Sequence, residues 1–350
     1  MSNKQRPRLC LVSQMPGDAS GSHSITQAQL LKNHFEVDGY TVMSVSSKSS
    51  RVGRLLDVVF ELSRARGRID VLIIEVYSGL SFVMADLASL VGRFLGIPSI
   101  FVLHGGNLPE FASSNPRWVR RVLSRARVIT APSKFLANAF VNAGYEVRVI
   151  PNVIRRFPTE VPLRSSSQPK VLWMRSFHPI YNPIMAVDAF AIVKGRFPEA
   201  VMIMAGSDKG REAETKRYVA EKGLGGCVTF PGFLDESKKP AEFAAANVYI
   251  NTNTVDNSPV SVIEAWSYGV PVVSTDVGGI PNMIRDGFNG FLVRSGDALA
   301  MADRIEEIFS DNDLAGSLSR GGREEARRST WESVAPMWAS IIGAAVNEPE

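Results

Sequence analysis

Residues 70–104 read DVLIIEVYSGLSFVMADLASLVGRFLGIPSIFVLH, the most apolar region of the chain. Glu75, Asp86, Arg93 and Pro98 interrupt it, so it lacks the run of about 18 apolar residues that a membrane-spanning helix needs. Short apolar runs at both ends flank a helical pattern, which predicts a buried strand, a helix and a second buried strand. Repetition of such a segment is typical of an open α/β sheet.

The same alternation extends through the chain in two series. In the first half we predict strands at Arg8–Ser13, Tyr40–Ser46, Asp70–Val76, Pro98–His104, Val128–Ala131 and Tyr145–Ile150. In the second half we predict strands at Lys170–Arg175, Ala200–Ala205, Val228–Phe230, Val248–Asn251, Val270–Ser274 and Gly290–Val293. Helical patterns lie between the strands, and Ser24 and Ser133 are the predicted N-caps of two of them.

A change of composition separates the two series. Pro158, Pro162 and Pro169 alternate with charged residues and serines between Arg155 and Lys170, as in a linker. We therefore predict an N-terminal Rossmann-like domain over 1–155, a linker over 156–169 and a C-terminal Rossmann-like domain over 170–330, with the two domains facing each other across a cleft. A last helix within 331–350 is expected to pack back on the N-terminal domain.

Charge and cysteine content restrict the class of protein. The 350 residues carry a net charge of +4, but residues 1–150 contribute +8 and residues 151–350 contribute −4. A basic half suits nucleic acid, anionic lipid or an anionic polymer, and the missing aromatic interleaving makes nucleic acid the weakest of these. Two cysteines suit a reducing cytoplasm and offer neither a disulfide framework nor a metal cluster. The polar, basic N-terminus is not typical of a signal peptide.

The basic stretches 51–68 and 117–127 have two interpretations. They are most simply solvated helix faces. Leu55, Leu56, Val59 and Leu62 recur at helical spacing among the first set of charges, so a helix lying on the inner face of a membrane is the alternative.

The segment from Asp256 to Gly279 carries the chemistry. A polar loop ends in Ser258-Pro259, and proline at a first helical position is a good helix start. The first backbone N–H groups of that helix, at Val260 and Ser261, would form an anion site suited to a diphosphate. Glu264 lies about one turn into the helix, where it could accept hydrogen bonds from the hydroxyls of a ribose, and Asp256 could hold those of a second sugar.

The same segment resembles the donor-site motif of the family 4 retaining glycosyltransferases, which have the GT-B fold. An acidic residue, seven intervening residues and Glu-Ala are followed by Gly-x-Pro-Val-Val-x-Thr and Gly-Gly, beginning here at Asp256 and ending at Gly279. The family's first acid is commonly glutamate, so Asp256 is one methylene shorter.

The resemblance also implies a phosphate clamp. Arg175 matches an arginine that contacts the donor diphosphate. A lysine usually follows it, but this sequence has Asn182 there, after an inserted-looking His178-Pro-Ile-Tyr181. His178 and Lys209 are both candidates to replace the missing cation.

Further site residues follow from the resemblance. Leu234 lies in a loop that resembles the one holding the donor base, and Lys239 falls where some relatives lay a side chain over that base. In the first domain His104 corresponds to a histidine near the transferred sugar. Gly21 belongs to a glycine loop near the phosphates, and glycine there lets the backbone approach an anion closely.

The resemblance implies a metal-independent, retaining glycosyltransferase without a cofactor. It would move a hexose-type sugar from a UDP- or GDP-sugar, bound mainly to the second domain, to a polysaccharide or lipid-linked acceptor bound mainly to the first. Two alternatives remain open: a nucleotide-sugar epimerase, and a catalytically weak scaffold in polysaccharide assembly.

Overall fold

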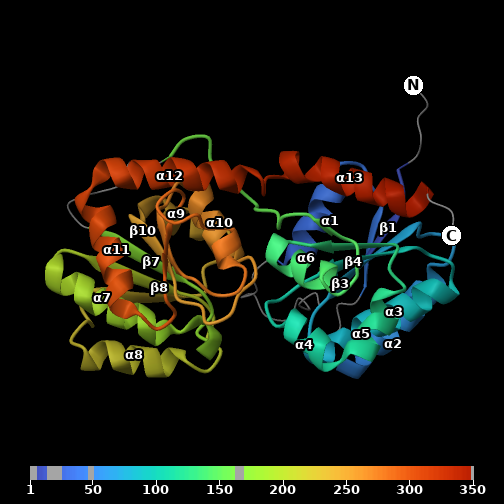
Figure 1. Cartoon of the computed structure of the whole chain (residues 1–350), viewed down its shortest axis with the longest axis horizontal. Coiled ribbons are helices and arrows are strands. Elements are labelled where there is room, and N and C mark those ends of the chain that lie inside the picture. Colours follow the sequence, from blue (N-terminus) through green and yellow to red (C-terminus); the bar gives the residue numbers. More distant parts are fainter. Residues whose placement is uncertain (1–5, 14–25, 46–50, 162–168, 348–350) are drawn as a thin grey trace. The chain divides into compact units, whose positions relative to one another are not determined.

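The computed structural model describes every residue except 1–5, 14–25, 46–50, 162–168 and 348–350, and it leaves the side chains of Arg51, Val52 and Arg54 undescribed. The chain forms two compact units. The first unit is Met1–Val153 with Trp331–Glu350, and the second unit is Ile154–Thr330 (Figure 1). None of the helices in the described part combines the length and apolar character that crossing a bilayer requires.

The first unit is built on a parallel sheet of six strands in the order β2-β1-β3-β4-β5-β6. The strands are β1 Leu9–Val12, β2 Val42–Val45, β3 Val71–Val76, β4 Ser99–Leu103, β5 Val128–Ala131 and β6 Val147–Val149. The helices are α1 Gln27–Val37, α2 Arg51–Arg64, η1 Gly79–Ser81, α3 Phe82–Phe94, α4 Leu108–Ser114, α5 Pro116–Leu123, α6 Lys134–Val141 and α13 Trp331–Asn347.

Alternating side chains of these strands bury both faces of the sheet. Leu72 and Ile74 pack with α2, α3, α5 and α6, whereas Val71 and Ile73 pack with α1 and α13. The helix at the C-terminal end of the chain thus covers the α1 face of the first unit, where Trp338 is 2% exposed (Figure 1). Burial on both faces explains why the strands are continuous apolar runs.

The second unit contains a parallel sheet in the order β12-β11-β10-β7-β8-β9. Its strands are β7 Lys170–Met174, β8 Val201–Ala205, β9 Val228–Gly232, β10 Val248–Asn251, β11 Val272–Thr275 and β12 Phe291–Val293. Its helices are η2 Pro179–Tyr181, α7 Pro183–Arg196, α8 Glu212–Glu221, α9 Lys239–Ala245, α10 Val260–Ser267, η3 Ile280–Asn282, α11 Ala298–Ser310 and α12 Asn312–Arg327. One face packs on α7 and α11, and the other packs on α9 and α10 (Figure 1).

Strand order places the crevice of the second sheet. The chain runs outward from β7 through β8 to β9, and then crosses back to β10 on the other side of β7. Read from its other edge, this is the order of the Rossmann fold, which binds ligands where the order reverses, at the carboxyl ends of the strands. That point lies between β7 and β10.

All twelve predicted strands are present, and no strand end differs from its predicted position by more than two residues. Ser133 caps α6 as predicted, since its hydroxyl accepts from the N–H of Leu136. The predicted cap of the first helix is wrong: Thr26 caps α1, which begins at Gln27, and Ser24 lies outside the described residues. Thr26 is itself a capping residue type, so sequence offers two equivalent starts. The central part of the predicted linker, 162–168, also lies outside the described residues.

Candidate functional site

An arginine and an aspartate meet at the crevice of the second sheet. Arg175 follows β7 and Asp256 follows β10, and their side chains form an ion pair with 2.9 Å between Nη2 and Oδ2. The two side chains are only 13% and 16% exposed. A largely desolvated pair of this kind attracts strongly, and losing one partner leaves the other charge uncompensated. Two residues 81 positions apart in the sequence thus occupy one place.

The loop that carries Asp256 is held rigidly. One carboxylate oxygen accepts from Asn253 Nδ2 at 2.5 Å, and the other accepts from the N–H of Asn257 at 2.7 Å. Gly278 has a φ of +56°, and a Cβ there would lie 2.0 Å from the carbonyl oxygen of Asp256. Gly279 donates its N–H to that same oxygen at 3.0 Å. The Gly-Gly pair of the motif therefore supports the aspartate.

Helix α10 begins beside the ion pair. Pro259 is its N-cap rather than its first helical residue, so Val260 and Ser261 are the first residues of the helix. The first N–H groups of a helix have no acceptor in a preceding turn. The hydroxyl of Ser261 accepts from Arg175 Nη1 at 3.1 Å. A helix start, a hydroxyl and a guanidinium therefore meet, which is an anion-binding arrangement.

A second charged group lies further along α10. Glu264 Oε1 is 3.4 Å from Lys239 Nζ, and that ammonium is 2.9 Å from Glu236 Oε1. Burial raises the pKa of Glu264 above its ordinary value, although Lys239 works in the opposite direction. Lys239 thus bridges two acids from the start of α9. Leu234, in the loop after β9, is 5% exposed and packs in the core under α9 and α10.

The place of the missing lysine is occupied by a structural residue. Asn182 adopts φ +44° and caps α7, its side-chain oxygen accepting from the N–H of Met185. His178 is engaged locally as well, because its Nδ1 accepts from the N–H of Ile180. Tyr181 instead stacks on Arg175, with 4.0 Å between the guanidinium carbon and the ring centroid. The insertion therefore brings an aromatic ring onto the guanidinium of Arg175.

Lys209 is the remaining candidate for a second cation. It is exposed in the loop after β8, and its N–H donates to the carbonyl of Phe177 in the loop that follows Arg175. The preceding Gly206 allows this approach: a Cβ there would lie 1.9 Å from the carbonyl oxygen of Arg175. Sequence reasoning gave no role to Gly206, Tyr181 or Asn253, and the insertion before Asn182 was the only signal for any of them.

In the first unit His104 belongs to a buried polar group at the carboxyl ends of β3 and β4. Its Nε2 lies 3.4 Å from Oε1 of Glu75, and its ring stacks on Tyr77 with 4.9 Å between centroids. Tyr77 donates its hydroxyl to the other oxygen of Glu75 at 3.3 Å. Burial raises the pKa of Tyr77, and the Glu75 charge adds to this, so the phenol stays protonated. Glu75 and Tyr77 were not predicted as site residues.

Two further predictions concern Gly21 and metals. Gly21 lies outside the described residues, so its role stays a prediction. Ser258, also a predicted donor contact, stands in the loop just before α10. In the described ranges, no group of three or more His, Cys, Asp or Glu side chains is arranged to hold a metal ion.

Comparisons with known proteins agree on one class of enzyme. The family model for glycosyl transferases group 1 matches residues 158–325, and the model for glycosyltransferase family 4 matches residues 25–155. The chain is 25% identical over 323 residues to the D-inositol 3-phosphate glycosyltransferase of Salinispora arenicola, covering 82% of this chain and 71% of that protein. It is 32% identical over 129 residues to the lipopolysaccharide core biosynthesis glycosyltransferase LpsE of Rhizobium meliloti, covering 37% of either chain. The chain thus matches little more than a third of the length of LpsE.

Solved structures share the fold over nearly the whole chain. Sucrose-phosphate synthase from Thermosynechococcus elongatus superposes with a TM-score of 0.77 at 20% identity, covering 96% of this chain and 98% of the other. HepE from Anabaena, solved with UDP and glucose, gives 0.75 at 18% identity, covering 97% of this chain and 100% of the other. With group 1 and family 4 models matched to its two halves, the chain belongs to the family 4 glycosyltransferases, of GT-B fold.

Proposed function

We propose that this glycosyltransferase is a retaining enzyme that moves a hexose-type sugar from a UDP- or GDP-sugar to a polysaccharide or lipid-linked acceptor. The observation that carries the proposal is the meeting of Arg175, Ser261 and the start of α10 at the crevice between β7 and β10. A nucleotide-sugar donor has a diphosphate in its middle, and this is the anion that such a group of donors suits. HepE, a structural neighbour, was solved with UDP and glucose.

Each end of the donor has a carboxylate in reach of the proposed phosphate position. Glu264, already partly paired with Lys239, would accept hydrogen bonds from the ribose hydroxyls. Asp256 would hold hydroxyls of the transferred sugar, as the family resemblance implies. Its carboxylate accepts from Arg175 and Asn253 on one oxygen and from Asn257 on the other, so the second oxygen keeps a lone pair that can accept from a sugar hydroxyl.

In the proposed reaction the bond from the sugar's anomeric carbon to the diphosphate breaks, and a bond to the acceptor oxygen forms on the same face. The acceptor proton passes to the leaving phosphate, so no protein nucleophile is assigned. Arg175 and the N–H groups of Val260 and Ser261 would stabilise the charge that develops on the leaving oxygen. We propose that no metal is required, because these fixed donors take that role, and that transfer continues in EDTA.

The acceptor is assigned to the first unit, where His104 lies among Glu75 and Tyr77. An imidazole beside a carboxylate can exchange hydrogen bonds with sugar hydroxyls.

A panel of nucleotide-sugars tests the proposal in two steps. A ligand that binds only the native state raises its melting temperature, so the donor should be the nucleotide-sugar that gives the largest shift. Turnover of that donor should then be lost in Glu264→Ala, and NMR of the product should show a retained anomeric configuration. Inversion of configuration would contradict the proposal.

Two other functions are outcomes of the same experiment. An epimerase would convert UDP-N-acetylglucosamine alone by inverting C2, without any acceptor. A scaffold with weak catalysis would bind a nucleotide-sugar and show the same slow turnover in wild type and Glu264→Ala.

We further propose a cytoplasmic enzyme that associates with the inner face of a membrane through its basic first unit. Helix α2 supports this only in part, because Leu56 and Val59 are exposed whereas Leu62, predicted on the same apolar stripe, is buried in the core. Sedimentation with anionic vesicles should fall when Arg51, Arg54, Arg64 and Arg66 become Ser.

A further inference from the structure

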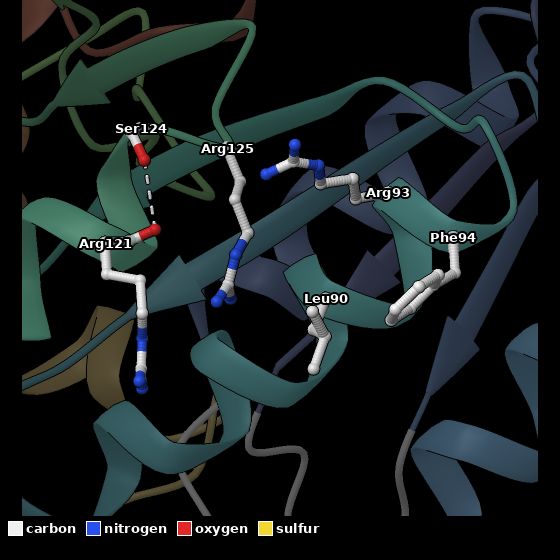
Figure 2. Close-up of a pocket in the computed structure, with 6 residues that line it drawn as sticks. All are labelled: Leu90, Arg93, Phe94, Arg121, Ser124 and Arg125. Atoms are coloured by element: carbon white, nitrogen blue, oxygen red, sulfur yellow. Dashed lines mark hydrogen bonds between the residues drawn. The ribbon is translucent and has the colours of Figure 1, made fainter.

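A pocket of about 610 Å³ lies on the first unit, at the ends of α3 and α5 (Figure 2). Its lining consists of Leu90, Arg93, Phe94, Arg121, Ser124 and Arg125. The side chain of Arg93 extends from the end of α3 toward Arg125, and Phe94 and Leu90 form the neighbouring rim (Figure 2). Cationic and apolar side chains therefore share one surface pocket.

The three arginines of this pocket differ in their exposure and in their ion pairs. Arg125 is 7% exposed and donates to Asp86 and to the Ser89 hydroxyl, so it is a structural residue. Arg121 donates to Asp86 at 2.8 Å but stays 62% exposed. Arg93 forms no ion pair or side-chain hydrogen bond with any residue that the structure describes. Asp86 thus pairs with two of the three guanidinium groups, and the third, on Arg93, leaves the pocket with a net positive charge.

The apolar rim is unusually exposed. Phe94 is 81% exposed and Leu90, one turn earlier on α3, is 37% exposed. Aromatic and aliphatic side chains next to arginines are the composition of surfaces that lie in a membrane interface, with the cations at the headgroups. A small soluble anion would use the arginines alone and would leave Phe94 in water. A nucleic acid would need aromatic rings placed for base stacking along a basic groove.

The position in the fold separates this pocket from the candidate acceptor site. Arg93 and Arg121 lie in the last turns of α3 and α5, which lead into the amino ends of the adjacent parallel strands β4 and β5. Arg64 ends α2, and Arg66 and Arg68 follow it in the connection to the amino end of the neighbouring strand β3. His104 lies at the opposite, carboxyl end of β4. A surface bound at the amino ends therefore leaves the His104 edge uncovered.

We propose that this edge of the first unit docks on an anionic phospholipid surface, with a lipid phosphate between Arg93 and Arg121 and with Phe94 and Leu90 in the interface. The proposal rests on the membrane association proposed above and gives it a location. A lipid phosphate in this place would satisfy the unpaired Arg93 and the exposed face of Arg121 at once.

Two single substitutions test the site without touching the core. Arg93→Glu reverses the unpaired charge, and Phe94→Ser removes the exposed ring. Arg93→Glu replaces an attraction to the anionic surface by a repulsion, and Phe94→Ser removes an apolar ring from the interface, so we expect each variant to bind phosphatidylglycerol-containing vesicles about tenfold more weakly. Lys32→Glu and Val37→Ser are matched controls on α1, which covers the other face of the sheet, and Val37 is 85% exposed. Both controls should bind as the wild type does.

Each outcome of the sedimentation assay has a distinct meaning. Failure of the wild type to bind phosphatidylglycerol vesicles overturns the membrane association and this site together. Binding that persists in Arg93→Glu and Phe94→Ser overturns the site alone. Calorimetric binding of inorganic phosphate that Arg93→Glu abolishes and Phe94→Ser leaves unchanged, with both variants still binding vesicles, identifies a small-anion site instead. Melting temperatures equal to that of the wild type verify that the variants are folded.

Discussion

The carboxyl ends of the central strands carry different chemistry in the two units. In the second unit, Arg175 and Lys239 stand among Asp256, Glu264 and Glu236, so that cations and acids are paired around a helix start. In the first unit, the polar group described at the carboxyl ends of β3 and β4 consists of a carboxylate, a phenol and an imidazole, with no arginine or lysine among them. One edge suits an anionic ligand and the other suits neutral hydroxyls. The difference supports a donor in the second unit and an acceptor in the first.

Removal of Arg175 should have the largest effect. Arg175→Ala removes a fixed charge from the place where the leaving phosphate develops its own, so kcat/KM should fall by about 10³. Arg175→Lys keeps the charge and loses the fork of donors that now reaches Asp256 and Ser261, so it should recover part of this loss. Steady-state kinetics with the donor measures both. Activity in Arg175→Ala within a factor of two of the wild type would remove the phosphate clamp from the proposal.

Two glycines allow a matched test of rigidity. Gly278→Ala would place a Cβ 2.0 Å from the carbonyl oxygen of Asp256, whereas Gly105, after His104, has open space and a φ of +86°. Left-handed backbone costs about 1–2 kcal/mol for alanine at either position, and the clash adds to this only at Gly278. We expect roughly 3 kcal/mol of lost stability for Gly278→Ala and about 1 kcal/mol for Gly105→Ala. Denaturant unfolding measures the free energy of unfolding of both variants. Equal losses would show that the Asp256 loop moves to accommodate the added Cβ.

The Glu264 carboxylate should matter for nucleotide binding more than for the fold. Glu264→Gln keeps the shape but weakens a charged hydrogen bond to the ribose, so the affinity for UDP or GDP should fall by about tenfold or more. Calorimetric titration of both nucleotides measures this. Asp235→Asn in the loop after β9 is a control, because within the described ranges that side chain accepts hydrogen bonds from Ser237 and Lys238 alone. Unchanged affinity in Glu264→Gln would show that a residue other than Glu264 holds the ribose.

A substitution beside His104 should lower the turnover number and leave the affinity for the donor unchanged. Glu75→Gln replaces the carboxylate 3.4 Å from His104 Nε2, and we expect kcat to fall by roughly tenfold through loss of one charged contact. Nucleotide affinity, measured by titration, should stay as in the wild type because Glu75 belongs to the first unit. A loss of nucleotide affinity instead would contradict the division between the two edges.

Sequence reasoning identified more of the group at the carboxyl ends of the strands in the second unit than in the first, for a physical reason. Asp256, Ser261 and Glu264 lie within nine residues of each other, so a loop and one helix turn are enough to bring them together. Arg175 was placed by the family resemblance, and the pairing of β7 with β10 in the structure brings the ends of these two strands side by side. The start of α10 was predicted one residue early, since proline suits both the cap and the first turn.

Other contacts depend on packing that no local pattern reports. Tyr181 over Arg175 requires the turn of η2 and the left-handed Asn182, both inside a stretch that looks like an insertion. Lys239 was expected over the donor base, and its bridge between Glu236 and Glu264 appears only when α9 and α10 pack on the same face of the sheet. Glu75 and His104 are 29 positions apart on neighbouring strands, and Glu75 resembles any other polar interruption of a buried strand.

The smallest expected effect is a dependence of stability on pH that comes from Glu264 in the second unit. Burial raises the pKa of Glu264 in the folded state, so the protonated carboxyl favours the native form. Its contribution is present below the ordinary glutamate pKa of about 4.3 and is lost as the pH rises through the folded value. Between these pH values the wild type should therefore lose stability relative to Glu264→Gln, whereas the exposed Glu221→Gln should leave the pH dependence unchanged. Melting temperatures across this range measure the difference. A wild type that gains stability relative to Glu264→Gln as the pH rises would mean that Lys239 outweighs the cost of burial.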